Sequence, residues 1–221
     1  MPSRLCDLSQ AVAGLSAVGL ALALVPVEDA RALEISDLAL EGEIKFFSQR
    51  PDPQGYRYES NLRISQDSLS SGLVGLSTCH RALDPNARVV IAFNPQRVRH
   101  IAITSSEGVG DARVVEHRVE LSQVQRGGSI CIDLVSQALE RTGEGRWRLH
   151  AGPLMRRYLD GYLPMQASLS FQWPEGLLNL RETMPGPQPG VQVARSRAGA
   201  RIDLVFAGRL NAALELESGS R

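Results

Sequence analysis

The sequence predicts a mainly β protein: an antiparallel β-sandwich, or a partly open barrel, with one or two short helices. Several segments alternate apolar and polar residues with a period of two, which is typical of strands with one face on a core and the other in water. Glycine, proline and aspartate separate these segments at short intervals. Many short strands with turn residues between them favour a sandwich or a barrel.

The clearest predicted strand covers residues 165–173. Its alternate positions are apolar and would share one buried face: Met165, Ala167, Leu169, Phe171 and Trp173. Polar residues fill the positions between them, and a proline stands just outside each end. Proline lacks the backbone N–H that a strand ladder needs, so it is typical of strand ends.

Further strands follow from the same pattern. Residues 202–216 predict a closing strand or hairpin with a bend at Gly208. Two β-branched runs, 88–93 and 98–104, are joined by an Asn-Pro turn and predict a hairpin. Weaker alternation predicts additional strands at residues 38–47, 56–65, 73–79, 113–124, 129–134, 146–150 and 177–181.

Two segments carry helical signals. Apolar residues recur at one-turn spacing over 134–139, and Asp133 is a candidate N-cap. The stronger signal covers 153–161, where Pro153 stands at a first-turn position and Gly161 at a C-cap position. Here Tyr158 lies within the apolar stripe of the predicted helix.

Residues 1–32 are typical of a cleavable secretory signal. An uncharged run of about 17 residues, 11–27, is followed by Ala30-Arg31-Ala32, which places small residues where a signal peptidase reads them. We expect cleavage after Ala32, so that the mature protein begins at Leu33. The alternative is an uncleaved membrane anchor, but the run is shorter than the roughly 20 residues that a spanning helix needs.

The sequence therefore predicts a periplasmic or secreted protein with no transmembrane span after cleavage. The mature part, residues 33–221, is expected to be one β-rich domain or two small β subdomains with a boundary near 143–153. The whole chain has 24 basic and 24 acidic residues. Because this balance provides no attractive field for nucleic acid, we expect no nucleic-acid partner.

Two cysteines, Cys79 and Cys131, remain after the predicted cleavage. An even pair in an exported chain is most simply a disulfide. A reactive thiol is the alternative, although neither cysteine lies in a Cys-x-x-Cys motif.

The sequence shows no motif for catalysis, for a metal or for a cofactor. The four histidines lack the spacing of metal ligands, and no nucleophile elbow, phosphate loop or dinucleotide fingerprint is present. We therefore expect no cofactor and no metal.

One segment, 152–164, is the candidate interaction surface because it concentrates the residue types found at binding hot spots. Its candidate residues are Arg156, Arg157, Tyr158, Asp160 and Tyr162. The alternative is that the apolar residues of this segment plug one end of the sandwich while the arginines keep that end in water.

Two functions follow from these patterns. The first is a non-enzymatic exported protein that binds a protein or glycan partner in the cell envelope. The second is an exported hydrolase that acts on a polysaccharide or a peptide. Its site would combine at least two of Asp133, Asp160, Glu175, His80 and His150 in a deep pocket.

Overall fold

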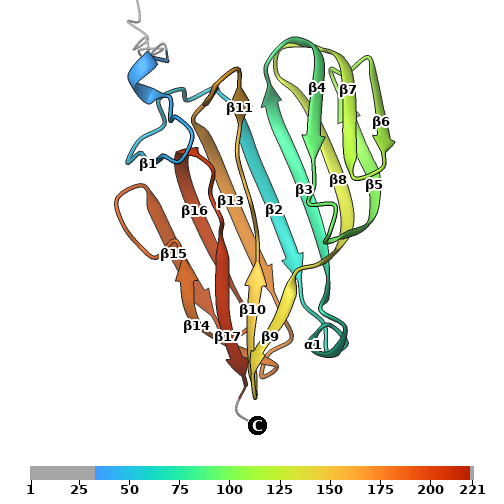
Figure 1. Cartoon of the computed structure of the whole chain (residues 1–221), viewed down its shortest axis with the longest axis vertical. Helices are drawn as coiled ribbons and strands as arrows, with labels where there is room; N and C mark the ends of the chain where they lie inside the picture. The colour runs from blue at the N-terminus through green and yellow to red at the C-terminus, as the bar shows by residue number, and fades with distance from the viewer. Residues whose placement is uncertain (1–32, 220–221) are drawn as a thin grey trace, which may run out of the picture.

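The computed structural model describes residues 33–219, and this part of the chain is mainly β, as the alternation predicts (Figure 1). Most of its strand pairs are antiparallel, with β13 and β2 the parallel pair. Two short helices accompany the strands, a 3-10 helix η1 (Ile35–Asp37) and α1 (Ser68–Ser71). The predicted signal segment, residues 1–32, lies outside the described residues.

The strands form one large sheet and three smaller ones. The large sheet runs in the order β1-β16-β13-β2-β3-β8-β5, and β15 pairs with β16 on the same side as β1 but along a different part of the strand. Its strands are β1 (Ile44–Phe46), β2 (Arg57–Arg63), β3 (Leu73–Leu83), β5 (Val98–Glu107), β8 (Gly128–Gln137), β13 (Met165–Gln172), β15 (Val191–Ser196) and β16 (Gly199–Gly208).

The smaller sheets have four, three and two strands. The four-stranded sheet contains β14 (Leu178–Met184), β17 (Ala213–Ser218), β10 (Arg146–His150) and β9 (Leu139–Gly143). The three-stranded sheet contains β4 (Asn86–Ala92), β7 (Arg118–Val124) and β6 (Asp111–Val115). The two-stranded sheet is a hairpin of β11 (Arg157–Tyr158) and β12 (Gly161–Tyr162).

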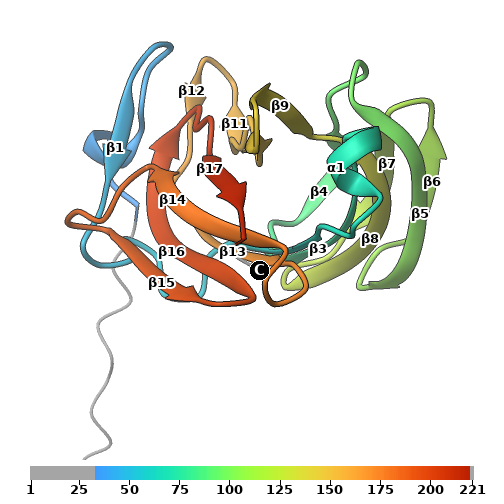
Figure 2. The same cartoon turned by 90° about the horizontal axis from the view of Figure 1, so that it is seen from below.

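One face of the large sheet is apolar and carries two hydrophobic cores. The first lies under the four-stranded sheet, where Leu169 and Ile202 pack with Leu214. The second lies under the three-stranded sheet, where Ile132 packs with Leu121. Figure 2 shows the four-stranded sheet over β13 and β16 and the three-stranded sheet beside β8 and β5. The opposite face of the large sheet is polar and open.

The two cores share one continuous sheet. Strand β13, which follows residue 153, pairs along its length with β2, which precedes residue 143. The large sheet is therefore not divided near residues 143–153. The possible division of the chain into two small β subdomains stays a prediction.

A disulfide joins Cys79 and Cys131, as predicted. The two residues are directly opposite each other on the antiparallel strands β3 and β8. Their Cα atoms lie 4.1 Å apart, so the sheet register itself brings the two sulfurs together.

The positions of the two predicted helices were wrong. Residues 134–137 belong to β8, which has strand partners on both sides, and these pairings override the one-turn spacing of apolar residues. Residues 153–161 form an extended segment and then the β11–β12 hairpin. The backbone of Leu154 exchanges hydrogen bonds with that of Leu210, which removes the groups that a first helical turn would use.

The predicted hairpin of 88–93 and 98–104 was also wrong in its pairing, although both strands exist. Strand β4 pairs with β7, and β5 pairs with β8. Each strand therefore finds a partner distant in sequence, and the Asn-Pro turn connects two sheets. Residues 165–172 form β13 with the predicted buried face. Among the described residues, no helix is long and apolar enough to cross a membrane.

Candidate interaction surface

The five residues of the candidate surface separate into two groups. Arg156 and Tyr162 are largely buried, with side-chain exposure of 14% for Arg156 and residue exposure of 3% for Tyr162. Arg157, Tyr158 and Asp160 are exposed. The hairpin thus combines side chains that fix it to the protein with side chains that face solvent.

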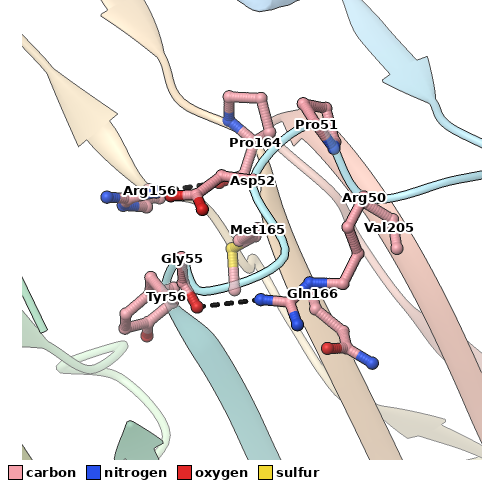
Figure 3. A pocket seen from close by; sticks show the side chains of 10 residues that line it. All are labelled: Arg50, Pro51, Asp52, Gly55, Tyr56, Arg156, Pro164, Met165, Gln166 and Val205. Carbon is pink, nitrogen blue, oxygen red and sulfur yellow. Dashed lines mark hydrogen bonds between the residues drawn. The ribbon is translucent and has the colours of Figure 1, made fainter. Parts of the chain in front are cut away.

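Arg156 fixes the hairpin to the loop before β2. Its Nη1 donates a hydrogen bond of 3.0 Å to the carbonyl oxygen of Pro164, and its guanidinium lies 5.4 Å from the ring centroid of Tyr56. It also forms an ion pair with Asp84. Figure 3 shows Arg156, Tyr56 and Pro164 around a small cavity of about 10 Å³, which has room for no more than a water molecule.

Tyr162 fixes the hairpin to the N-terminal segment. Its backbone pairs with that of Ala39, and its hydroxyl donates a 2.5 Å hydrogen bond to Glu41. The Glu41 carboxylate raises the pKa of Tyr162. It accepts the hydrogen bond from the hydroxyl, and its negative charge disfavours a negative charge on the Tyr162 oxygen. The hairpin and residues 33–47 therefore form one continuous end of the molecule (Figure 1).

This end exposes seven large apolar side chains, which we call the apolar end: Leu33, Ile35, Leu40, Ile44, Met155, Tyr158 and Leu159. Ile35 is 88% exposed and Leu159 is 79% exposed. Leu159 also has a positive φ of 50° at the tip of the hairpin, a conformation that is unusual for a leucine. Exposed apolar patches on a folded protein are typical of interaction sites.

The charge around the apolar end is acidic. Residues 33–45 contain four acidic side chains and a single basic one, Lys45. The hairpin adds Arg157 and Asp160 at its exposed surface. The apolar end therefore lacks the cluster of basic residues that typically accompanies binding to anionic lipid.

A buried histidine, His80, lies between the two cores, and its hydrogen-bond partner Tyr56 also contacts Arg156. The Nδ1 atom of His80 is 2.6 Å from the hydroxyl of Tyr56, and the ring of Tyr58 packs edge-on against the imidazole at 5.2 Å. Burial lowers the pKa of His80 to about 4, so the imidazole is neutral at pH 7. Burial raises the pKa of Tyr58 to about 12 and raises that of Tyr56 further.

The residues considered for a hydrolase do not come together. His80 is buried between the cores, and His150 lies on β10 with its Nε2 3.0 Å from the Glu140 carboxylate. Asp133 is exposed on β8, opposite Ser77 of β3 and Ala102 of β5. Asp160 is in the hairpin turn and Glu175 is in the loop before β14. Within residues 33–219, no group of three His, Cys, Asp or Glu side chains is placed to hold a metal ion.

A polar hollow of about 470 Å³ lies on the open face of the large sheet. Two of its four charged lining residues, Arg201 and Asp203, are paired with each other. Arg201 donates to Asp203 at 2.7 and 3.0 Å, and Ser168 donates to the same carboxylate at 2.7 Å. Glu59 accepts a hydrogen bond of 2.9 Å from Arg81. Arg57 also lines the hollow and forms no ion pair within the described residues, so this face carries a small positive excess.

Comparison with known proteins gives a distant structural likeness alone. No family model matches the chain, and no curated protein matches it. An M1 zinc metallopeptidase variant from Deinococcus radiodurans, bound to a Tyr-Ser-Ala substrate, aligns with a TM-score of 0.38 and 11% identity, over 77% of this chain and 45% of that chain. A two-domain M1 zinc metallopeptidase variant bound to L-tryptophan aligns with a TM-score of 0.39 and 8% identity, over 81% and 44%.

Aminopeptidase A from Legionella pneumophila, in complex with aspartic acid, aligns with a TM-score of 0.36 and 10% identity, over 79% of this chain and 23% of that chain. The chain therefore spans less than half the length of each of these structures. Likeness at this level carries no argument about activity.

Proposed function

We propose that this protein is a non-enzymatic, exported β-sandwich protein of the cell envelope that binds a protein partner through its apolar end. One observation carries the proposal. Two segments more than 100 residues apart in sequence meet at one end of the fold and expose seven large apolar side chains there. The signal-like residues 1–32 and the disulfide between Cys79 and Cys131 support export.

The composition of the apolar end favours a protein partner over a lipid or a glycan. The acidic excess of residues 33–45 opposes approach to an anionic lipid surface. A glycan site typically offers aromatic rings for stacking, and Tyr158 is the one aromatic side chain of the apolar end. An apolar centre with a polar rim is typical of protein–protein interfaces.

The anchors of the hairpin make this surface suitable for binding. Arg156 and Tyr162 hold the two ends of the hairpin through the carbonyl of Pro164 and the carboxylate of Glu41. Tyr158 and Leu159 are thereby presented on a fixed turn, which reduces the conformational entropy that ordering a loop would cost on binding.

Site-specific photo-crosslinking tests the proposal. A photoreactive amino acid at Leu159, in the mature protein expressed in its native host, should give one dominant cross-linked protein from the envelope fraction. The double variant Tyr158→Ser with Leu159→Ser is tested with the photoreactive amino acid in place of Ile35. It should lose this product, because truncating hot-spot side chains costs about 2 kcal/mol or more of binding.

Leu73→Ser is the matched control. Leu73 is also an exposed apolar residue, at 37%, but it follows α1 at the opposite end of the molecule (Figure 1). It should leave the cross-linked product unchanged. Equal cross-linking in the double variant, with an unchanged Tm, would show that the apolar end is not the binding surface.

A further inference from the structure

The outer face of the three-stranded sheet carries an unusual cluster of charges. Arg88 on β4, Arg113 on β6, and Arg118 and Glu120 on β7 all point away from the second core. The Glu120 side chain is 8% exposed although it lies on a solvent-facing surface, because the arginine side chains cover it. We call these four residues the arginine cluster.

All three arginines converge on the one carboxylate. Arg88 Nη2 and Arg118 Nε donate to Oε1 of Glu120, each at 3.0 Å, and Arg113 Nη2 donates to Oε2 at 3.2 Å. Hydrogen bonds from Arg113 and Arg88 hold the pKa of Glu120 below its ordinary value, so the carboxylate stays ionised. The positions of the three guanidinium groups are therefore set by a shared acceptor.

This arrangement leaves an excess of positive charge and of hydrogen-bond donors. Three guanidinium groups share one carboxylate, so two positive charges have no partner within the cluster. The side chains of Arg88 and Arg113 are 65% and 67% exposed. Each guanidinium has five N–H donors in a planar fork, and a fork of this shape matches the oxygens of carboxylate or phosphate groups.

Apart from Glu120, no neighbouring acid forms an ion pair with the three arginines within the described residues. Asp111 lies on the same face of β6, opposite Ser122, and forms no ion pair with these arginines within the described residues. Glu116 lies in the turn between β6 and β7, where its carboxylate is 3.9 Å from His117.

We propose that the arginine cluster is a binding site for a phosphomonoester group. A phosphomonoester carries a charge of about −1.5 to −2 at pH 7 and has three acceptor oxygens, which match the excess charge of the cluster and its three arginines. A carboxylate or a phosphodiester has a single charge and would leave part of the excess without a partner. The ligand is a phosphorylated small molecule or free inorganic phosphate.

Titration of the mature protein at low ionic strength tests this site. Inorganic phosphate, a hexose phosphate and sulfate are added separately, and backbone amide chemical shifts are followed by NMR. Saturable shifts should appear on β4, β6 and β7. A hexose phosphate that binds more tightly than inorganic phosphate would identify a phosphorylated small molecule as the ligand, and the reverse order would identify free phosphate.

The pH dependence separates a phosphomonoester site from general attraction of anions. The second proton of a phosphomonoester leaves with a pKa of about 6, so the affinity for the hexose phosphate should rise severalfold between about pH 5 and 7.5. Sulfate is a dianion throughout this range, and its affinity should stay nearly constant. Equal pH dependence for the two anions would overturn the assignment to a phosphomonoester.

Variants locate the site. Arg88→Gln with Arg113→Gln should weaken phosphate binding at least tenfold, because it removes both exposed forks. Glu120→Gln should strengthen binding, since it raises the excess charge by one while its amide oxygen still accepts. Arg197→Ala is the control, because its side chain is 91% exposed and it lies in the β15–β16 turn.

Two further results would overturn the proposal. One is the absence of saturable shifts on the three-stranded sheet with any of the anions. The other is equal binding by wild type and by a folded double arginine variant, with folding checked by circular dichroism.

Discussion

Arg156→Ala is the change for which the structure makes the sharpest prediction, because the residue is an anchor and its neighbour Arg157 is exposed. The substitution removes three contacts at once. These are the hydrogen bond to the carbonyl of Pro164, the placement over the ring of Tyr56 and the ion pair with Asp84.

The magnitude follows from these contacts. A hydrogen bond from a charged donor contributes about 1.5–3 kcal/mol, and a cation–π contact adds about 0.5–1 kcal/mol. The ion pair adds little, because the Asp84 side chain is 60% exposed and exposed pairs contribute about 0–1 kcal/mol. These contributions overlap, so we expect a loss of about 2–3 kcal/mol, or a fall in Tm of roughly 4–12 °C for a domain of this size.

Urea and thermal unfolding, followed by circular dichroism, measure this loss. Arg157→Ala is the matched control, because it removes the same side chain from the adjacent exposed position and should change stability by less than about 0.5 kcal/mol. In a Tyr56→Leu background, Arg156→Ala should cost about 0.5–1 kcal/mol less, because the ring that it covers is already gone. Equal effects of the two single arginine substitutions would refute the assignment of Arg156 as the anchor.

Three further predictions concern stability and processing. Burial lowers the pKa of His80 from 6.5 to about 4, so the unfolded chain binds more protons than the folded protein between these pH values. The free energy of unfolding should therefore fall by up to about 3 kcal/mol as the pH drops from about 6.5 to 4. In urea unfolding at several pH values, His80→Gln should show a weaker dependence of stability on pH. Replacing both Cys79 and Cys131 by alanine opens a loop of 52 residues and should cost about 4 kcal/mol in urea unfolding; a cost near zero would contradict the chain-entropy reasoning. Intact-mass measurement of protein from the native host should show a chain that begins at Leu33, and retention of residues 1–32 would reverse the prediction of export by a cleaved signal.

Local patterns predicted much of the fold. The alternation in residues 165–173 placed the strand and its buried face correctly, because strand side chains point to opposite faces in turn. Local signals failed where a distant partner competed with them. In 153–161, the capping signals favoured a helix, but pairing of Leu154 with Leu210 and of Tyr162 with Ala39 made the segment extended.

The candidate surface shows the same limit at the level of single residues. The sequence identified the segment, yet it placed Tyr158 in the apolar stripe of a helix. In the hairpin Tyr158 is 57% exposed and Tyr162 is buried. No local signal could have separated Arg156 from Arg157, because the partners that bury Arg156 include Tyr56, which lies 100 residues earlier in the chain.

By itself, the sequence determined the class of the fold, the two cysteines expected to pair and the segment of the candidate surface, although it predicted a helix there. Those features depend on the period of the strand, on the number of cysteines and on a local concentration of residue types. Only the tertiary structure decided that residues 33–44 and 155–159 share one apolar end, and that Arg88 meets Glu120, 32 residues away. The register between strands sets these contacts, and long-range pairing and burial fix that register, so a local pattern does not encode it.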